Sequence, residues 1–296
     1  MQGYHEPVLL DKVLALLQVK KGEVYMDATL GDGGHTIEIL KLGGTVLGID
    51  YSELSLGNAV KRIDELNLSA NFIPVLGNFT QIYDIAKDNK LESIHGILFD
   101  LGYSSTQLDE NLGISFLQDQ DLDMRIDKSL GVMAKDLVNA LSAPELERLF
   151  RDYGDEKLAR RFATAIVDYR KLKKFETTSE LASVIKTCAP LSYDNGRIHP
   201  ATRVFMALRI AVNNELDNIK YALPRAAQLA VESMLPGGRM LVISFHSLED
   251  SIVKTFGKTV QPVMKEVYKK PVVPSDVEVA RNPRSRSAKM RVFEKI

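Results

Sequence analysis

The sequence contains a glycine-rich segment in which acidic, hydroxyl and imidazole side chains are also concentrated, Asp27-Ala28-Thr29-Leu30-Gly31-Asp32-Gly33-Gly34-His35. It follows a short apolar run and opens a helical pattern, and glycines at such a turn let the main chain bend sharply and let a ligand approach its N–H groups. Asp50 ends the next apolar run, where a carboxylate can accept hydrogen bonds from both hydroxyls of an adenosine ribose. The pattern suits S-adenosylmethionine and a dinucleotide equally, although Thr36 replaces the third glycine of the dinucleotide pattern. A purely structural tight turn is the alternative.

A second acidic turn ends the fourth apolar run and has the sequence Asp100-Leu101-Gly102-Tyr103-Ser104-Ser105. In an open parallel sheet, ligands bind beyond the carboxyl ends of the strands. Asp100 could therefore act in catalysis by accepting hydrogen bonds from the amino group of a planar base, with Tyr103, Ser104 and Ser105 contacting that base. An exocyclic amine is a poor nucleophile, because its lone pair is delocalised into the ring. Its attack on the methyl carbon of a cofactor would be helped most by acceptors for its N–H groups and by a fixed alignment with that carbon. No metal is required. The alternative is a strand-end turn in which Tyr103 covers the core.

His246 follows the last strong apolar run, within Ser244-Phe245-His246-Ser247-Leu248-Glu249-Asp250. A histidine at this edge of a sheet could contact the substrate. It could equally cap the next helix together with Ser247. The chemistry of the residues alone favours the cap, because a lone histidine is more often structural.

The elements that must position these residues follow from the hydrophobic pattern of the first hundred residues. Short apolar runs cover 24–26, 45–49, 71–75 and 94–99, and helical patterns cover 34–42, 52–66 and 79–90. Strands that alternate with helices of this length indicate a parallel sheet with right-handed crossovers. The acidic residues at the strand ends are therefore expected at one edge of the sheet.

The middle of the chain lacks this alternation. Helical patterns occupy 144–153, 155–170 and 178–188. Further on, one helix is predicted to reach about residue 222, another to run from Pro224 to Leu235, and a buried strand to span 240–245. We therefore predict an α/β protein with a mostly parallel, Rossmann-like sheet domain formed by 1–105 and 206–296. A helical domain, 106–205, is expected to interrupt it and to recognise the substrate.

Composition narrows the classes of protein to be considered. The chain has 296 residues, of which 45% are apolar and 26% charged, which is sufficient for one large or two packed domains. The single cysteine, Cys188, excludes an internal disulfide and a cysteine-based metal cage. No apolar run approaches the roughly 18 residues needed to span a bilayer, and the N-terminus lacks the pattern of a secretory signal. We expect a soluble, cytoplasmic protein with no membrane partner.

Charge is distributed unevenly although the formal net charge is only −1. A balanced total argues mildly against a nucleic-acid binder. However, the segment 157–174 carries seven basic residues against one acid, Asp168, and the segment 281–296 carries six against one, Glu294. Such clusters can bind a polyanion locally, and solvated helix faces are an equally weighted alternative.

A series of motifs runs in order nearly from end to end of the chain. They are His5-Glu6-Pro7-Val8-Leu9-Leu10; the segment 27–35; Gly96-Ile97-Leu98-Phe99-Asp100-Leu101-Gly102; Ser104-Ser105-Thr106-Gln107-Leu108-Asp109; Leu122-Asp123-Met124-Arg125; His199-Pro200-Ala201-Thr202-Arg203; Ala207-Leu208-Arg209-Ile210-Ala211-Val212-Asn213; the segment 243–250; and Asn282-Pro283-Arg284-Ser285-Arg286-Ser287-Ala288-Lys289. In this number and order they resemble the bacterial 16S ribosomal RNA cytosine-N4 methyltransferase family of the MraW or RsmH type.

The resemblance implies a class I methyltransferase fold with a helical insertion, and S-adenosylmethionine as cofactor. The cofactor contacts that it implies in this chain are Gly33, Gly34, His35, Asp50, Phe79, Asp100 and Gln107. The implied substrate is a cytidine of 16S ribosomal RNA, at the peptidyl-site region of the small subunit. The basic segments 157–174 and 281–291 then become surfaces that contact phosphates. A homodimer is compatible with the sequence.

The chain departs from the family pattern at three places outside the cofactor motifs. Where the family pattern has an arginine, this chain has Asn111-Leu112. Met206 stands in place of a glutamine, and Ser251 stands in place of a second arginine. These changes bear on substrate contacts more than on methyl transfer. Two other functions are weighed against this one: an NAD-dependent oxidoreductase, which Thr36 disfavours, and a noncatalytic RNA-binding module, which the intact glycine turn and Asp50 disfavour.

Overall fold

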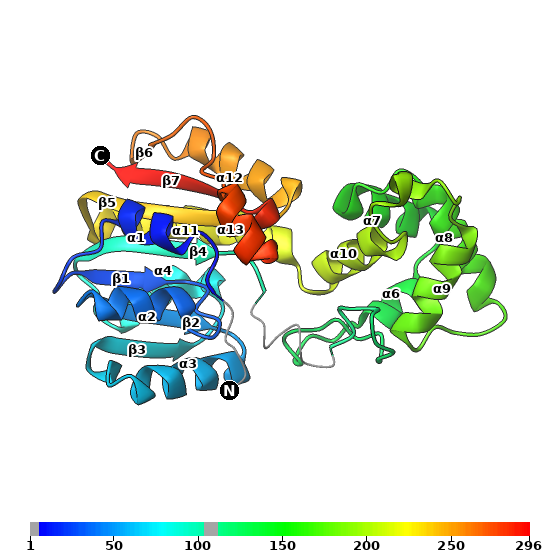
Figure 1. Cartoon of the computed structure of the whole chain (residues 1–296), viewed down its shortest axis with the longest axis horizontal. Helices are drawn as coiled ribbons and strands as arrows, with labels where there is room; N and C mark the ends of the chain where they lie inside the picture. Colours follow the sequence, from blue (N-terminus) through cyan, green and yellow to red (C-terminus); the bar gives the residue numbers. More distant parts are fainter. Residues whose placement is uncertain (1–5, 104–111) are drawn as a thin grey trace. The chain divides into compact units, whose positions relative to one another are not determined.

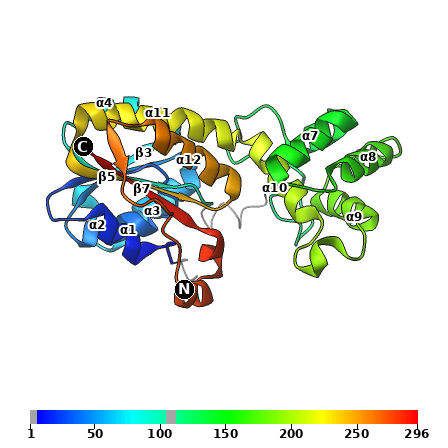
Figure 2. The same ribbon diagram turned by 90° about the horizontal axis from the view of Figure 1, so that it is seen from above.

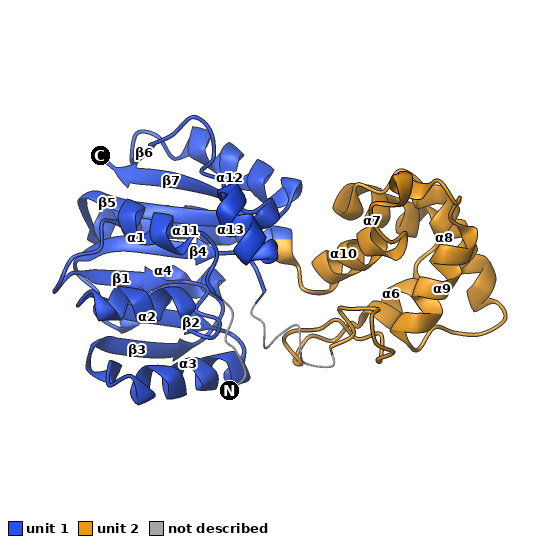
Figure 3. Cartoon of the chain, in the orientation of Figure 1, with its two compact units in different colours: residues 1–106, 216–296 blue, residues 107–215 orange. Residues whose placement is uncertain are grey.

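The computed structural model describes residues 6–103 and 112–296. The chain divides into two compact units, which are coloured separately in Figure 3. Unit 1 consists of Met1–Thr106 and Leu216–Ile296, and unit 2 consists of Gln107–Glu215. No helix in the described part of the chain is long and apolar enough to cross a membrane.

Unit 1 is built on a seven-stranded sheet with the strand order β3-β2-β1-β4-β5-β7-β6 (Figure 1). The strands are β1 Val24–Asp27, β2 Thr45–Asp50, β3 Phe72–Leu76, β4 Ile94–Asp100, β5 Met234–Ser244, β6 Met264–Glu266 and β7 Lys289–Lys295. Strands β1 to β5 pair in parallel with one another, whereas β7 lies between β5 and β6 and is antiparallel to both. This topology confirms the prediction of a mostly parallel, Rossmann-like class I methyltransferase fold.

Helices cover both faces of this sheet, as Figure 2 shows for α4 and α11 on one side and α1 and α2 on the other. The helices of unit 1 are α1 Leu10–Leu17, α2 Gly34–Lys41, α3 Glu53–Glu65, α4 Ile82–Asp88, α11 Glu215–Ser233, α12 Ser247–Thr259 and α13 Asp276–Arg281. Successive residues of a strand point to opposite faces, so β4 sends Ile97 and Phe99 into the core under α4 and α11, and Leu98 into the core under α1 and α2. Strands buried on both faces explain the continuous apolar runs in the sequence.

The predicted helix break at Pro224 is wrong. Pro224 lies inside α11, which is one continuous helix. The break occurs earlier, at Asn214, whose positive φ of 51° separates α11 from the preceding helix. Leu223 and Ala226, on either side of the proline, are buried in the core of unit 1. Packing of this apolar face therefore holds the helix together where local preference predicts an end.

Unit 2 is a bundle of helices with a core of its own. It contains α6 Ala134–Ala140, α7 Ala143–Gly154, α8 Ala159–Arg170, α9 Thr178–Cys188 and α10 Ala201–Val212. The predicted end of the helical domain at residue 205 falls inside α10 and has to be corrected. Phe205, Leu208 and Val212 belong to the same buried cluster as the other helices of unit 2, so the apolar face of α10 keeps the whole helix in this unit.

Arg291 of β7 is a buried cation and contradicts the prediction that all of the segment 281–291 contacts phosphates. Its side chain is 5% exposed. Its Nε donates to Asp250 Oδ1 at 2.7 Å and its Nη1 donates to Glu266 Oε1 at 2.8 Å. Arg291 therefore links the first turn of α12 to β6 and β7 and is not available to a ligand.

We expect Arg291→Ala to lower the free energy of unfolding by about 3 kcal/mol, because it removes the buried cation from two partly buried carboxylates and leaves Asp250 only the more distant Lys289, at 3.8 Å. Lys265→Ala is a matched control, since it removes a cation of β6 whose side chain is 56% exposed and leaves its partner Glu294 paired with Arg239, and pairs with an exposed cation contribute little. Urea unfolding followed by circular dichroism compares the two variants. Equal losses would contradict a structural role specific to Arg291.

Candidate functional site

The predicted site lies where β1, β2 and β4 end. Asp27, the last residue of β1, is buried, and its carboxylate accepts hydrogen bonds from Thr29 N at 3.2 Å and from Thr36 Oγ1 at 2.8 Å. Burial raises the pKa of Asp27. Thr36, which departs from the dinucleotide pattern, thus holds the carboxylate that ends β1, a contact that the sequence analysis missed.

The glycine turn is required by packing within unit 1. Gly33 has a φ of 78°, which disfavours any side chain there. A Cβ on Gly34 would lie 2.5 Å from Cγ of Pro7. The close approach that demands a glycine at position 34 is therefore that of the N-terminal segment, a contact between motifs that sequence reasoning treated separately. The prediction that Gly33 and Gly34 contact a cofactor remains a prediction.

The carboxylate of Asp50, at the end of β2, can accept further hydrogen bonds. Its Oδ2 accepts from Gly31 N at 2.8 Å and its Oδ1 accepts from Ser52 N at 2.8 Å. Each carboxylate oxygen can accept a second hydrogen bond. Burial is the main cause that raises the pKa of Asp50 to about 6, against the lowering effect of the two N–H groups. A ligand that offers a pair of hydroxyl donors would satisfy this buried acid.

His35, in the first turn of α2, and Asp100, at the end of β4, bring unsatisfied polar atoms together. Nε2 of His35 lies 3.3 Å from Oδ2 of Asp100, without the alignment of a hydrogen bond. Among the described residues, both ring nitrogens of His35 and Oδ1 of Asp100 are buried and have no hydrogen-bond partner. Unpaired buried polar atoms cost free energy and are rare in folded proteins. These atoms therefore fit a polar ligand that enters between them.

The remaining residues predicted at the strand ends differ in what the structure describes. Phe79 follows β3 and packs edge-on against Phe99, with ring centroids 6.2 Å apart. Gly102 leaves room for the ring of Phe245, which a Cβ would approach to 2.7 Å. Tyr103 is partly buried. Ser104, Ser105 and Gln107 lie outside the described residues.

His246 caps α12, as the chemistry of the residues alone favoured. Its Nδ1 accepts from Glu249 N at 3.4 Å. In return, Oε2 of the buried Glu249 accepts from Phe245 N at 2.6 Å and from His246 N at 3.2 Å. Glu249 was missed as a site-shaping residue, although its position three residues after the cap is the spacing of a capping box. A contact between His246 and substrate remains a prediction.

Comparison with known proteins places the chain in a family. The model of the MraW methylase family matches residues 2–296. The chain belongs to the MraW methylase family. It is 44% identical over 317 residues to the ribosomal RNA small subunit methyltransferase H of Acetivibrio thermocellus, with 100% of both chains covered. It is 40% identical over 296 residues to the protein of the same name from Sulfurihydrogenibium, with 99% of both covered.

A solved structure with lower similarity is an rRNA methylase from Streptococcus thermophilus, which is 12% identical, with 99% of each chain covered and a TM-score of 0.43. The resemblance predicted from the motifs is confirmed by the family match, and the chain is a methyltransferase. The alternative of an NAD-dependent oxidoreductase is thereby excluded.

The raised pKa of Asp50 predicts a specific pH dependence of stability. The folded-state pKa of about 6 exceeds the ordinary value of 3.8, so the folded protein binds the proton more tightly than the unfolded chain. The contribution of Asp50 to stability therefore falls as the pH rises from about 4 to about 6 and is constant above that.

Asp50→Asn cannot ionise, so its free energy of unfolding relative to the unaltered protein should rise by roughly 1–3 kcal/mol across this window. Urea unfolding of both proteins without ligand, at several pH values between 4 and 7, measures the difference. A difference that does not change with pH would rule out a buried, proton-retaining Asp50.

Proposed function

We propose that this protein transfers a methyl group from S-adenosylmethionine to the exocyclic N4 amine of a cytidine in 16S ribosomal RNA, near the ribosomal peptidyl site. The observation that carries the proposal is the full-length relation to proteins named ribosomal RNA small subunit methyltransferase H, at 40–44% identity. The arrangement of Asp50, His35 and Asp100 at one edge of the sheet supports it, because a nucleoside cofactor and a base both need polar partners there.

The acceptors at the strand ends fit S-adenosylmethionine. In the proposed complex, Asp50 accepts from the ribose hydroxyls through the lone pairs that Gly31 and Ser52 leave free. Phe79, after the adjacent strand β3, offers an apolar edge to the adenine. The other proposed contacts are Gly33, Gly34, His35, Asp100 and Gln107. When bound, the cofactor supplies an electrophilic methyl group on a sulfonium that is already a good leaving group.

Asp100 is the proposed catalytic residue, in the sense that it positions the reacting amine. Its Oδ1 is buried and has no partner in the described part of the chain, so it can accept a hydrogen bond from an N–H of the target cytosine. Main-chain N–H of Asp100 donates to Thr29 Oγ1 at 2.6 Å, which fixes the end of β4. In this proposal Tyr103, Ser104 and Ser105 hold the base, so that the amine nitrogen stays aligned with the methyl carbon of the cofactor.

The proposed partner is 16S ribosomal RNA within the small ribosomal subunit. The proposed location of the reaction is the cytoplasm, where that subunit is found. Unit 2 is the proposed substrate-recognition part, because it contains the basic segment 157–174. In the segment 281–289, the cations Arg281 and Lys289 pair with Glu6 and Asp250, whereas Arg291 is engaged in buried ion pairs. A homodimer is compatible with this proposal.

The direct test is to map modified cytidines in small-subunit ribosomal RNA by mass spectrometry, in cells with and without this protein. We expect one N4-methylated cytidine to disappear without the protein and to return when the gene is restored. Purified protein should also methylate unmodified small subunits. RNA binding with no methyl transfer under any condition would instead support the noncatalytic alternative.

Two substitutions at the ends of β2 and β4, the strands on either side of β1, should affect different steps. Asp100→Asn keeps the shape but loses a charged acceptor, and it should slow single-turnover methyl transfer at saturating cofactor by about 100- to 1000-fold. Its cofactor affinity should change less. Asp50→Ala should instead weaken S-adenosylmethionine binding by roughly 1.5–3 kcal/mol, measured by titration calorimetry, because charge-assisted hydrogen bonds are lost. A normal rate for Asp100→Asn, with only a lowered melting temperature, would reduce Asp100 to a structural turn residue.

A further inference from the structure

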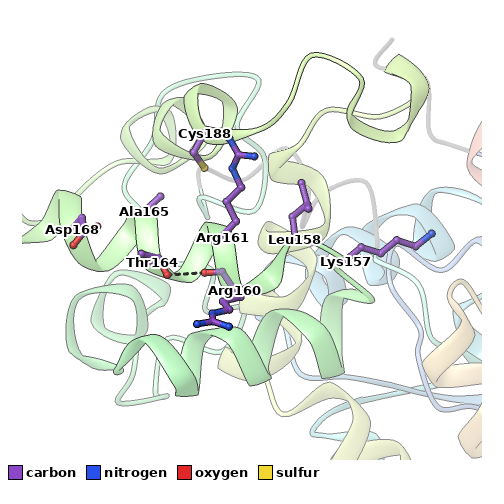
Figure 4. Close-up of a pocket in the computed structure, with 8 residues that line it drawn as sticks. All are labelled: Lys157, Leu158, Arg160, Arg161, Thr164, Ala165, Asp168 and Cys188. Atoms are coloured by element: carbon purple, nitrogen blue, oxygen red, sulfur yellow. Dashed lines mark hydrogen bonds between the residues drawn. The ribbon is translucent and has the colours of Figure 1, made fainter.

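Unit 2 carries an open hollow on the surface of α8, next to the end of α9. Its volume is about 570 Å³, and the residues that matter here are Lys157, Arg160, Arg161, Thr164, Ala165 and Cys188. Figure 4 shows Arg160 and Arg161 leaving α8 in different directions, with Arg161 extending toward Cys188. A hollow of this size falls in the range of roughly 300–1,000 Å³ that accommodates small organic ligands such as a nucleotide.

Not all basic residues of the segment 157–174 are available to a ligand. Arg170 donates to the carbonyls of Val138 at 2.8 Å and Leu141 at 2.6 Å. Lys171 pairs with Asp168 at 2.7 Å, and Lys173 pairs with Glu180. These three cations are therefore already engaged within unit 2.

The cations at the hollow differ from those two lysines in having no acidic partner in the described part of the chain. Lys157, Arg160 and Arg161 are exposed, and none of them has a carboxylate within 4.0 Å among residues 6–103 and 112–296. Asp168, the acid that also lines the hollow, is held by Lys171. Three positive charges within five residues, none of them paired with a described carboxylate, repel one another and favour a bound polyanion.

Part of the lining of the hollow is apolar. Ala165 and the thiol of Cys188 line the hollow, and Sγ of Cys188 is turned to the carbonyl of Ile185 at 3.3 Å. The hydroxyl of Thr164 is likewise satisfied, since it donates to the carbonyl of Arg160 at 2.9 Å. An apolar part together with nearby cations suits an unstacked nucleotide, whose base packs on the protein while its phosphates meet the cations.

We propose that this hollow binds a nucleotide of the substrate RNA other than the one that is methylated. The base lies against Ala165 and Cys188, and the flanking phosphates contact Lys157, Arg160 and Arg161. This inference rests on the proposed function in one respect, namely that the substrate is RNA. It assigns to unit 2 a binding site separate from the strand-end residues of unit 1.

The first test compares two double variants that remove the same charge. The Arg160→Ala, Arg161→Ala protein loses two unpaired cations, whereas the Lys135→Ala, Lys173→Ala protein loses two cations of unit 2 that are paired with Glu176 and Glu180, away from the hollow. We measure binding of a single-stranded ribosomal RNA oligonucleotide at several salt concentrations. Each phosphate contact in a single strand contributes about 0.7 to the salt slope, so the arginine variant should lose about 1.4 and the lysine variant markedly less.

The second test uses Cys188, which is the only cysteine in the sequence. Burial raises the pKa of its thiol, so alkylation by iodoacetamide is followed at alkaline pH. The same RNA should slow alkylation severalfold in the unaltered protein, and this protection should be lost in the arginine variant. S-adenosylmethionine alone should not protect Cys188.

Methylation of unmodified small subunits, measured in parallel, distinguishes a failure of the proposed function from a failure of the proposed nucleotide site. No methylation by the unaltered protein would count against the proposed function. Normal methylation together with equal salt slopes for the two double variants, or with no protection of Cys188 by RNA, would overturn the hollow as a nucleotide site. In the expected outcome, KM for the subunit rises more than kcat falls in the arginine variant.

Discussion

The burial of carboxylates at the carboxyl edge of the unit 1 sheet is the constraint on which the proposed site depends. Asp27, Asp50 and Asp100 end three neighbouring parallel strands. Burial raises the pKa of Asp27 and of Asp50, and the charge of a neighbouring aspartate adds to the rise in each. Carboxylates removed from water need donors in its place. Two donors of unit 1 serve Asp27 and two N–H groups serve Asp50, whereas Oδ1 of Asp100 lacks one among the described residues.

This constraint connects stability with function. An ionised Asp50 in a buried position destabilises the protein without ligand, and the same acid is available to bind a ribose. The glycine turn also serves both packing and the site. Contact with Pro7 and the backbone conformation require its glycines. The same requirements keep the start of α2 close to the three carboxylates. A site whose polar groups are satisfied only when ligand is present is expected to gain stability on binding.

The two units divide the properties that an RNA-modifying enzyme needs. Unit 1 concentrates buried acids, which suit a positively charged cofactor and an amine. Unit 2 presents exposed cations around an apolar hollow, which suit the phosphates and bases of a strand. The net charge of −1 conceals this division. Other basic side chains, such as Arg291, are held by acids of the fold itself.

The sequence by itself determined the alternation of strands and helices, the strand ends at Asp27, Asp50 and Asp100, and the family, because these depend on local periodicity and on the order of short motifs. Only the tertiary structure decided what depends on residues distant in the chain. Packing against the core carries α11 through Pro224 and keeps α10 in unit 2. Segment 157–174 looks uniformly basic, yet its cations differ in their partners, because a helix places neighbouring side chains on different faces and only some of those faces meet an acid.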